Sequence, residues 1–163
     1  MEKNFVLTGM RGSGKTTIGK KLAKKLKYKF LDSDELLEKD FHCSISQFIE
    51  KNGWNKFRTK EKNMIKKLSQ KKGFVVATGG GSIIDQENEK MLKKNGMVIF
   101  LNCPIKVLQK RIDNDPLTPK RRPPLKNLKT IYEERKKRYH ESADLVIYSE
   151  NEDENHIIEK LFY

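Results

Sequence analysis

The amino-acid sequence predicts an α/β fold, with a five-stranded parallel sheet covered by helices on both faces. Short apolar segments alternate with longer amphipathic segments along the chain, the pattern of repeated strand–helix–strand units. A length of 163 residues suits one domain. A glycine-rich stretch directly follows the first apolar segment, where such a unit turns from strand to helix. These three observations define the fold class before any single residue is considered.

In the first half of the chain, strand and helix signals follow one another closely. Phe5, Val6 and Leu7 are consecutive apolar residues and predict a strand, and the apolar spacing from Ile18 to Leu26 predicts a helix. A short strand is expected at Phe30 and Leu31. Ser44 and Gln47 have the spacing of a capping box, which predicts a helix start. The predicted strands here are residues 4–8 and 30–31, and the predicted helices are residues 18–26, 35–39, 44–50 and 54–70.

The second half repeats the alternation and then interrupts it. Residues 115–126 hold four of the five prolines and four basic residues, so we expect a mobile surface loop or lid there. Pro104 suits the first position of a helix. The predicted strands of this half are residues 74–77, 97–101 and 145–148, and its predicted helices are residues 86–94, 104–113, 128–142 and 155–162.

Composition excludes several classes of protein and leaves the charge to be explained. No apolar run approaches the roughly 20 residues that a membrane helix needs. The two cysteines, Cys43 and Cys103, form no zinc-binding or disulfide pattern, so a reduced, cytoplasmic protein is expected. The net charge of +13 fits a nucleic-acid binder, an enzyme for anionic substrates, or a lysine-rich surface. Only seven basic residues are arginines, which suit carboxylate and phosphate recognition, so each deserves individual attention.

Residues 9–16 read G-M-R-G-S-G-K-T and match the phosphate-binding pattern G-x-x-x-x-G-K-[ST] at every fixed position. Glycines let successive backbone N–H groups face one concavity at a helix N-terminus, where phosphate is favoured. Lys15 would reach the β- and γ-phosphates, and the Thr16 hydroxyl would hold Mg²⁺ directly. The alternative is a glycine turn that binds nothing. The predicted nucleotide-binding residues of this loop are Gly12, Ser13, Gly14, Lys15, Thr16 and Thr17.

An acidic pair follows the second predicted strand. The third strand ends in T-G-G-G without an acidic residue, so a magnesium-orienting carboxylate must come from Asp32 or Asp34. Two carboxylates at positions i and i+2 point the same way if the stretch is extended. One can serve the metal, and the other can handle the hydroxyl of an acceptor. The alternative for both is a helix N-cap, which does not exclude catalysis.

Together these motifs resemble the shikimate kinase family, small P-loop kinases that phosphorylate shikimate from ATP. The resemblance covers roughly residues 4–148. It rests on G-M-R-G-S-G-K-T-T at 9–17, D-S-D at 32–34, F-R-T-K-E at 57–61, G-G-G at 79–81, a basic, proline-containing lid at 119–125 and E-R-K-K-R-Y at 134–139. It implies one P-loop kinase domain over residues 1–163, with a mobile lid at about 115–127. The implied reaction gives shikimate 3-phosphate and ADP on the route to chorismate and aromatic amino acids, with Mg²⁺ as cofactor.

The resemblance also implies roles for individual residues. The substrate pocket would consist of Asp34, Arg58, Gly80 and Arg135. Two arginines can clamp the shikimate carboxylate, and Asp34 would act as the general base or orient the hydroxyl. Three further residues would support the site: Glu61 would hold Arg58, Phe57 would form an apolar wall, and Asp32 would reach the metal through water. Three arginines would serve the nucleotide side: Arg122 on the lid at the ATP phosphates, Arg111 beside the adenine, and Arg11 near the acceptor or a phosphate. The expected catalytic residues are Lys15, Asp34 and Arg122.

Three departures from the family pattern leave alternatives open. The lid reads Arg121-Arg122-Pro123, so either arginine can be the active one. Trp54 stands where an acidic residue is common, and Arg138 can compete with Arg135 for the carboxylate.

Other functions remain open as well. Gluconate kinases and nucleoside monophosphate kinases are the alternatives among enzymes, and a basic nucleic-acid-binding P-loop module is the alternative from another class. The stretch 115–140 carries the densest positive charge but lacks an aromatic base-stacking motif. We therefore expect a monomer that binds shikimate and ATP and binds neither nucleic acid nor membrane.

Overall fold

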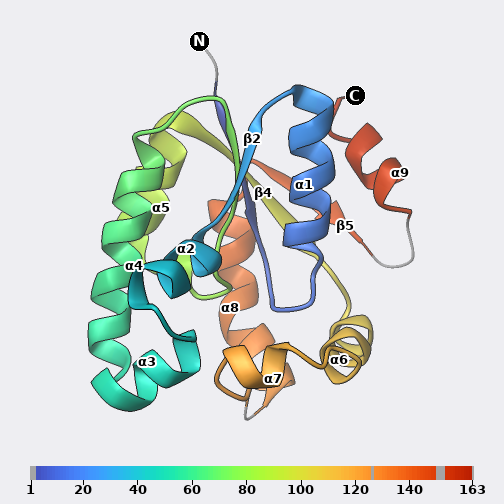
Figure 1. The fold of residues 1–163 in the computed structure, drawn as a ribbon. Coiled ribbons are helices and arrows are strands. Elements are labelled where there is room, and N and C mark those ends of the chain that lie inside the picture. Colours follow the sequence, from blue (N-terminus) through green and yellow to red (C-terminus); the bar gives the residue numbers. More distant parts are fainter. Residues whose placement is uncertain (1–2, 126, 150–152, 163) are drawn as a thin grey trace.

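The computed structural model describes residues 3–125, 127–149 and 153–162, and they form one α/β domain around a five-stranded sheet (Figure 1). The strand order is β2-β3-β1-β4-β5, and every neighbouring pair is parallel. The strands are β1 (Asn4–Thr8), β2 (Lys29–Asp32), β3 (Phe74–Ala77), β4 (Gly96–Asn102) and β5 (Leu145–Tyr148). The predicted fold class and the five predicted strands are confirmed.

Helices connect the strands and cover the sheet on both faces, as predicted (Figure 1). They are α1 (Lys15–Leu26), α2 (Ser33–Phe41), α3 (Ile45–Asn52), α4 (Trp54–Ser69), α5 (Gln86–Asn95), α6 (Ile105–Asp113), α7 (Thr118–Arg121), α8 (Leu128–Ser142) and α9 (Glu154–Glu159), with a short 3₁₀ helix η1 (Ser82–Ile84). The capping box of Ser44 and Gln47 is present at the start of α3. Within the described part of the chain, no helix is both long and apolar enough to cross a membrane.

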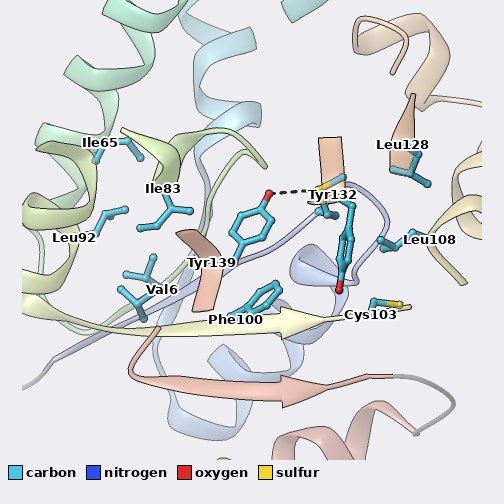
Figure 2. Packing of buried hydrophobic residues seen from close by; sticks show 12 residues of the cluster. Val6, Ile65, Ile83, Leu92, Phe100, Cys103, Leu108, Leu128, Tyr132 and Tyr139 are labelled. Atoms are coloured by element: carbon cyan, nitrogen blue, oxygen red, sulfur yellow. Dashed lines mark hydrogen bonds between the residues drawn. The ribbon is translucent and has the colours of Figure 1, made fainter. Parts of the chain in front are cut away.

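Alternate residues of the central strands build two cores, one on each face of the sheet. Leu7 of β1 and Ile99 of β4 pack with α1 and α9, whereas Val6 and Phe100 pack with α4, α5, α6 and α8. Figure 2 shows this second core, in which the Phe100 ring stacks on the Tyr139 ring of α8 with centroids 4.9 Å apart. A smaller cluster joins α2, α3 and α4 over β3. Because Tyr139 is fully buried, α8 is fixed against the sheet, and this fixes the polar residues along it.

Some predicted element boundaries were wrong. Pro104 precedes α6 as its N-cap instead of occupying its first turn, and α2 begins at Ser33, directly after β2. The segment predicted as a lid without regular structure contains the short helix α7, because Leu117 accepts a backbone hydrogen bond from Lys120 and closes a helical turn. Residue 126, inside that predicted lid, lies outside the described residues.

Candidate active site

A cavity of about 960 Å³ opens where the carboxyl ends of β1, β2 and β3 meet. This is where ligands bind in open parallel sheets. Residues far apart in the sequence line it, from the phosphate-binding loop, the acidic pair, the glycine triplet, the start of α4, the lid and α8. Among the predicted site residues, the cavity lining includes Gly12, Ser13, Gly14, Lys15, Thr16, Thr17, Asp32, Asp34, Phe57, Arg58, Glu61, Gly80, Arg111, Arg122 and Arg135.

The loop between β1 and α1 has the conformation that its glycines allow. Gly12 and Gly14 have φ of 81° and 94°, in the region that favours glycine. A Cβ on Gly9 would lie 2.8 Å from the carbonyl oxygen of Leu101, so that position admits only glycine. The Lys15 ammonium donates to the carbonyl oxygens of Gly9 and Met10 at 2.9 and 2.8 Å, bridging the loop. The loop therefore forms a compact cradle at the N-terminus of α1, with a cation inside it.

Thr16 and Asp32 connect the phosphate loop to the acidic pair. The Thr16 hydroxyl donates to Oδ2 of Asp32 at 2.9 Å. Oδ1 of Asp32 accepts from the backbone N–H groups of Asp34 and Glu35 at 3.0 and 3.3 Å, so Asp32 is the N-cap of α2. The capping alternative for Asp32 is therefore correct, and it coexists with the contact to Thr16. One carboxylate oxygen stabilises the helix while the other faces the loop.

Asp34 lies in the first turn of α2 and faces the cavity. Its Oδ1 lies so close to Gly79 that a Cβ there would be 2.8 Å away, and Oδ2 is 3.3 Å from Nε of Arg122. Burial raises the pKa of Asp34 to about 6, although the positive charge of Arg122 opposes the rise. A carboxyl group with this pKa is ionised at neutral pH yet can accept a proton readily, which suits a general base.

Lys15 is also tuned by its surroundings. Burial lowers its pKa to about 8, while the negative charges of Asp34 and Asp32 work in the opposite direction. At neutral pH the ammonium is therefore mainly charged. A charged amine with little water around it attracts an arriving polyphosphate strongly. The backbone carbonyl oxygens of Gly9 and Met10 fix its position.

Arg58 is held by the residue one helical turn after it. Its Nη1 donates to Oε1 of Glu61 at 2.7 Å, and Oε2 of Glu61 accepts from the Ser82 hydroxyl at 2.7 Å. Glu61 is almost completely buried, whereas the Arg58 side chain is 41% exposed. The Arg58 guanidinium also lies 5.4 Å from the centre of the Phe57 ring. The predicted support of Arg58 by Glu61 is present, and it leaves the outer edge of the guanidinium accessible.

Arg135 approaches the glycine triplet from α8. Its Nη1 lies 3.4 Å from the place that a Cβ on Gly80 would occupy, and the Tyr139 hydroxyl donates to the Gly80 carbonyl at 2.5 Å. Burial raises the pKa of Tyr139 to about 12, so its hydroxyl remains a donor. On the other side of the triplet, the position of a Cβ on Gly81 is 2.7 Å from Nη2 of Arg58. The glycine triplet thus separates two guanidinium groups: a Cβ on Gly81 would displace the Arg58 guanidinium, whereas a Cβ on Gly80 would only reach van der Waals contact with Arg135.

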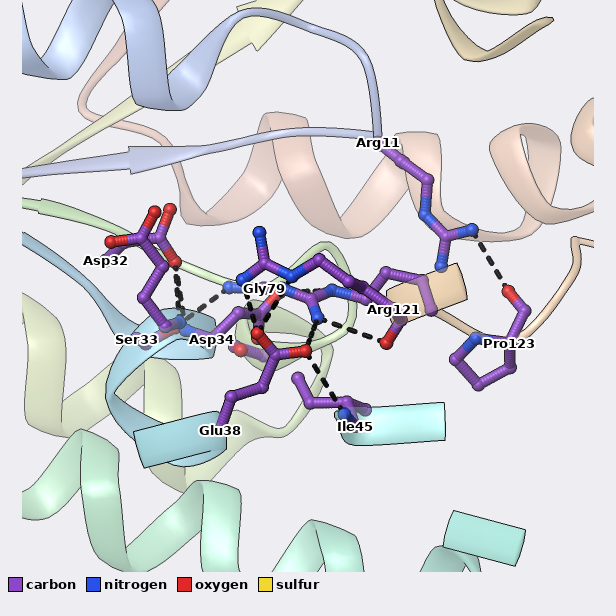
Figure 3. A network of polar contacts seen from close by, with 12 residues as sticks. Arg11, Asp32, Ser33, Asp34, Glu38, Ile45, Gly79, Arg121 and Pro123 are labelled. Atoms are coloured by element: carbon purple, nitrogen blue, oxygen red, sulfur yellow. Dashed lines mark hydrogen bonds and ion pairs between the residues drawn. The ribbon is translucent and has the colours of Figure 1, made fainter. Parts of the chain in front are cut away.

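The lid arginines contact carboxylates of α2 (Figure 3). Arg122 pairs with Asp34 through Nε at 3.3 Å and with Glu38 through Nη1 at 2.6 Å. Arg121 pairs with Glu38 through Nε at 3.0 Å and through Nη2. From the phosphate loop, Nη1 of Arg11 donates to the carbonyl oxygen of Pro123 at 3.0 Å. The lid segment therefore contacts both the acidic helix and the phosphate loop. Contact of Arg122 with ATP phosphates stays a prediction.

Of the two remaining arginines named from the sequence, Arg111 lines the cavity and Arg138 does not. Nη1 of Arg111 donates to the carbonyl oxygen of Gly12 at 3.1 Å, next to the phosphate loop, and its role beside adenine stays a prediction. Arg138 pairs with Glu89 of α5 and with Glu141, and it is not among the residues that line the cavity. Of these two arginines of α8, Arg135 is therefore the one that lines the cavity.

Three polar residues of the site were missed by sequence reasoning. Ser82 and Tyr139 hold Glu61 and Gly80, and Glu38 binds both lid arginines. Tyr139 belongs to a motif that was noted, but no local signal points to its hydroxyl. Glu38 stands four positions after Asp34, on the same face of a helix, and that spacing was the available signal.

Several known proteins are similar to this chain in sequence and in structure. The family model described as "Shikimate kinase" matches residues 11–163. The shikimate kinase of Persephonella marina is 37% identical over 159 residues, covering 98% of this chain and 96% of that protein. A shikimate kinase from Acinetobacter baumannii, solved in complex with shikimate, has a TM-score of 0.88 and 32% identity, covering 99% of this chain and 92% of that one. The shikimate kinase structure from Bacteroides thetaiotaomicron also has a TM-score of 0.88, with 29% identity and coverage of 99% and 97%. The chain belongs to the shikimate kinase family of enzymes, the kinases that phosphorylate shikimate on the shikimate pathway.

Proposed function

We propose that this chain transfers the γ-phosphoryl group of ATP to the 3-hydroxyl of shikimate. The observation that carries the proposal is that one cavity contains a phosphate loop, a tuned carboxylate and two arginines positioned for an anionic acceptor. The part of the site around Lys15 suits a triphosphate. The part around Arg58 and Arg135 suits a small carboxylic acid. Asp34 lies between them, where the acceptor hydroxyl must meet the phosphoryl group.

Magnesium is the cofactor that the donor set fits. Within residues 3–125, 127–149 and 153–162, no three His, Cys, Asp or Glu side chains cluster into a metal cage. Mg²⁺ does not need such a cage, because it keeps several waters and uses few protein ligands together with substrate phosphates. Thr16 would hold it directly through the hydroxyl, and Asp32, at 2.9 Å from that hydroxyl, would reach it through water. The bound ion would neutralise phosphate charge during transfer.

The chain's own residues divide the chemistry between them. Lys15 and the N–H groups of residues 12–17 would bind the phosphates, and Arg122 would add positive charge from the lid. Asp34 would accept the proton of the attacking hydroxyl, which its pKa of about 6 allows at neutral pH. The lid at about residues 115–127 would exclude water during transfer, since a phosphoryl donor open to solvent is hydrolysed.

Recognition of the acid rests on the two arginines. A guanidinium presents two parallel N–H donors that match a carboxylate. Glu61 occupies one side of Arg58 and leaves the other free, and Arg135 reaches the same space across Gly80. The hydroxyl groups of shikimate would bind Asp34 and the backbone of the glycine triplet, which comes close because it lacks side chains.

An assay of ADP release with a panel of acceptors tests the proposal. We expect ADP release that depends on shikimate and on Mg²⁺, and no release with gluconate or nucleoside monophosphates. Turnover of gluconate or a nucleotide in place of shikimate would contradict the proposed acceptor.

The remaining parts of the proposal concern assembly and partners. We propose a cytoplasmic monomer that does not bind nucleic acid, because its rare arginines are assigned to the cavity or to ion pairs and its many lysines form a charged surface. Sedimentation and a gel shift at low salt test these points. Binding to nucleic acid that weakens steeply with salt would contradict the second.

A further inference from the structure

Glu38 has an unusual number of positively charged partners for a residue outside the predicted site. It lies on α2, one turn after Asp34, and its side chain is only 13% exposed. Oε1 accepts from Arg122 at 2.6 Å and from the Ile45 backbone N–H at 3.2 Å, and Oε2 accepts from two nitrogens of Arg121. Figure 3 shows the Glu38 carboxylate next to Arg121 and Ile45. A partly buried carboxylate with four hydrogen bonds is a fixed element of the structure.

The two lid arginines are not equivalent at this carboxylate. Arg121 directs Nε and Nη2 at Glu38, and its side chain is 42% exposed at the rim of the site. Arg122 divides its donors between Glu38 and Asp34, and its side chain is only 16% exposed. Both arginines line the cavity, but Arg122 is the more enclosed of the two and lies beside the proposed general base. Arg121 fastens the lid at the more exposed rim.

From this geometry we infer that Glu38 is a positioning residue for phosphoryl transfer: it anchors the lid to α2 through Arg121 and thereby places Arg122 at the reacting groups. The inference rests on the proposed function for the identity of those groups. It assigns different tasks to two adjacent arginines, a choice that the sequence leaves open. Arg121 remains on Glu38 throughout, whereas Arg122 exchanges its carboxylate partners for phosphate when the nucleotide is bound.

Charge balance supports this division. Without a ligand, Arg121 and Arg122 face the carboxylates of Glu38 and Asp34, so two positive charges meet two negative ones. A triphosphate brings several negative charges into the same cavity and competes for the nearest free guanidinium. Arg122 can respond without releasing the lid, because Glu38 keeps its contacts with Arg121. The contact of Arg11 with the Pro123 carbonyl provides a second attachment, from the phosphate loop.

Amide hydrogen exchange in the ligand-free protein tests the anchor without relying on any activity. We expect exchange across residues 115–125 to be about tenfold faster in Glu38→Gln and in Arg121→Met, the change expected when a charge-assisted hydrogen bond is lost. Matched controls are Asp40→Asn, which removes an exposed charge from the same helix, and Lys120→Met, which removes the neighbouring lid charge. Both should exchange as the wild type does. Exchange in Glu38→Gln no faster than in Asp40→Asn would overturn the inference.

Steady-state kinetics test the division of tasks. Arg121→Met should raise KM for ATP and shikimate about tenfold, because the lid is placed over the ligands less readily. It should change kcat less than about threefold, because the phosphates hold Arg122 in place once the nucleotide is bound. Arg122→Met should lower kcat by at least about a hundredfold. Glu38→Gln added to Arg121→Met should change little, since the shared contact is already lost. The reverse pattern for the two arginines, or additive effects of Glu38→Gln and Arg121→Met, would overturn it.

These experiments distinguish a loss of folding from a loss of the lid contact, and a failure of the anchor from a failure of the proposed function. The Arg121 side chain is less buried than that of Glu38, so Arg121→Met tests the contact even if Glu38→Gln disturbs folding. A wild-type chain inactive on shikimate, with a lid that loosens in Glu38→Gln, would refute the proposed function and leave the anchor standing.

Discussion

The Thr16 hydroxyl donates to the Asp32 carboxylate across 2.9 Å and so joins the first turn of α1 to the N-cap of α2. The Asp32 side chain thus caps α2 and also faces the position proposed for Mg²⁺. The phosphate loop and the acidic helix are connected before any ligand binds. Asp34 follows two residues later, and its backbone N–H donates to Oδ1 of Asp32, so the same helix turn positions Asp34 in the cavity.

The first prediction separates the two tasks of Asp32. Asparagine caps helices as well as aspartate, so Asp32→Asn should leave the free energy of unfolding within about 0.5 kcal/mol of the wild type. It should raise the Mg²⁺ concentration required for half-maximal activity, because the negative charge is lost. Asp32→Ala should show the same magnesium effect and lose about 1 kcal/mol of stability in addition. An unchanged magnesium requirement in both variants would remove Asp32 from the metal site.

The second prediction concerns Arg58. Arg58→Lys keeps the charge but loses the planar fork, so KM for shikimate should rise about 10- to 100-fold while KM for ATP stays the same. Lys60→Ala, an exposed residue of the same helix, is the control. An unchanged KM for shikimate in Arg58→Lys would place the carboxylate elsewhere.

The third prediction follows from the raised pKa of Asp34. Folding favours the protonated form, because burial raises the pKa from 3.8 to about 6. The stability it contributes is complete below about pH 4 and is lost as the pH rises through 6. Asp34→Asn should therefore unfold like the wild type at pH 4 and be more stable at pH 7.5, by up to about 3 kcal/mol. Thermal unfolding at the two pH values measures this. If Asp34→Asn and the wild type were equally stable at both pH values, the charge of Asp34 would not destabilise the folded protein.

The same group should govern the activity profile. The proposed base must be ionised, so kcat/KM should fall as the pH decreases below about 6, the pKa of Asp34 in the free enzyme. The fall should be absent from the small residual activity of Asp34→Asn. An identical acidic limb in that variant would assign the titration to another group.

Two glycine substitutions distinguish the site from the core. A Cβ on Gly81 would lie 2.7 Å from the Arg58 guanidinium, the movable end of a long side chain, so Gly81→Ala should raise KM for shikimate and hardly change stability. A Cβ on Gly19 would lie 2.5 Å from the Phe30 ring, so Gly19→Ala should destabilise the core by about 1–3 kcal/mol without a selective effect on KM. Equal effects of both on KM would contradict the assigned positions.

The features that could be predicted from the sequence are those that depend on residues within a few positions of one another. Residues 9–16 predict the phosphate loop because each glycine meets a backbone requirement within a few positions. Arg58 and Glu61 are one turn apart on one helix, so their pairing was predictable. The strands were recognisable because most are continuous apolar runs buried on both faces of the sheet.

Contacts between segments that are far apart in the sequence could not be predicted in this way. Glu38 meets Arg121 and Arg122 across more than 80 positions, and no periodicity indicates which loop arginine will reach a given helix. The bond from Tyr139 to Gly80 likewise depends on the packing of α8 against the sheet. Helix α7 was missed because four nearby prolines suggested an irregular loop, although proline is tolerated in the first turn of a helix and Pro119 is the second residue of α7.

We propose that one cavity holds the nucleotide and the acid, with Asp34 between them. A crystal structure with ADP, Mg²⁺ and shikimate tests it most directly. We predict the shikimate carboxylate on Arg58 and Arg135, a ring hydroxyl on Asp34, and the ADP phosphates on the loop around Lys15. Shikimate bound away from Arg58 and Arg135, or with its hydroxyls turned away from Asp34, would contradict the account.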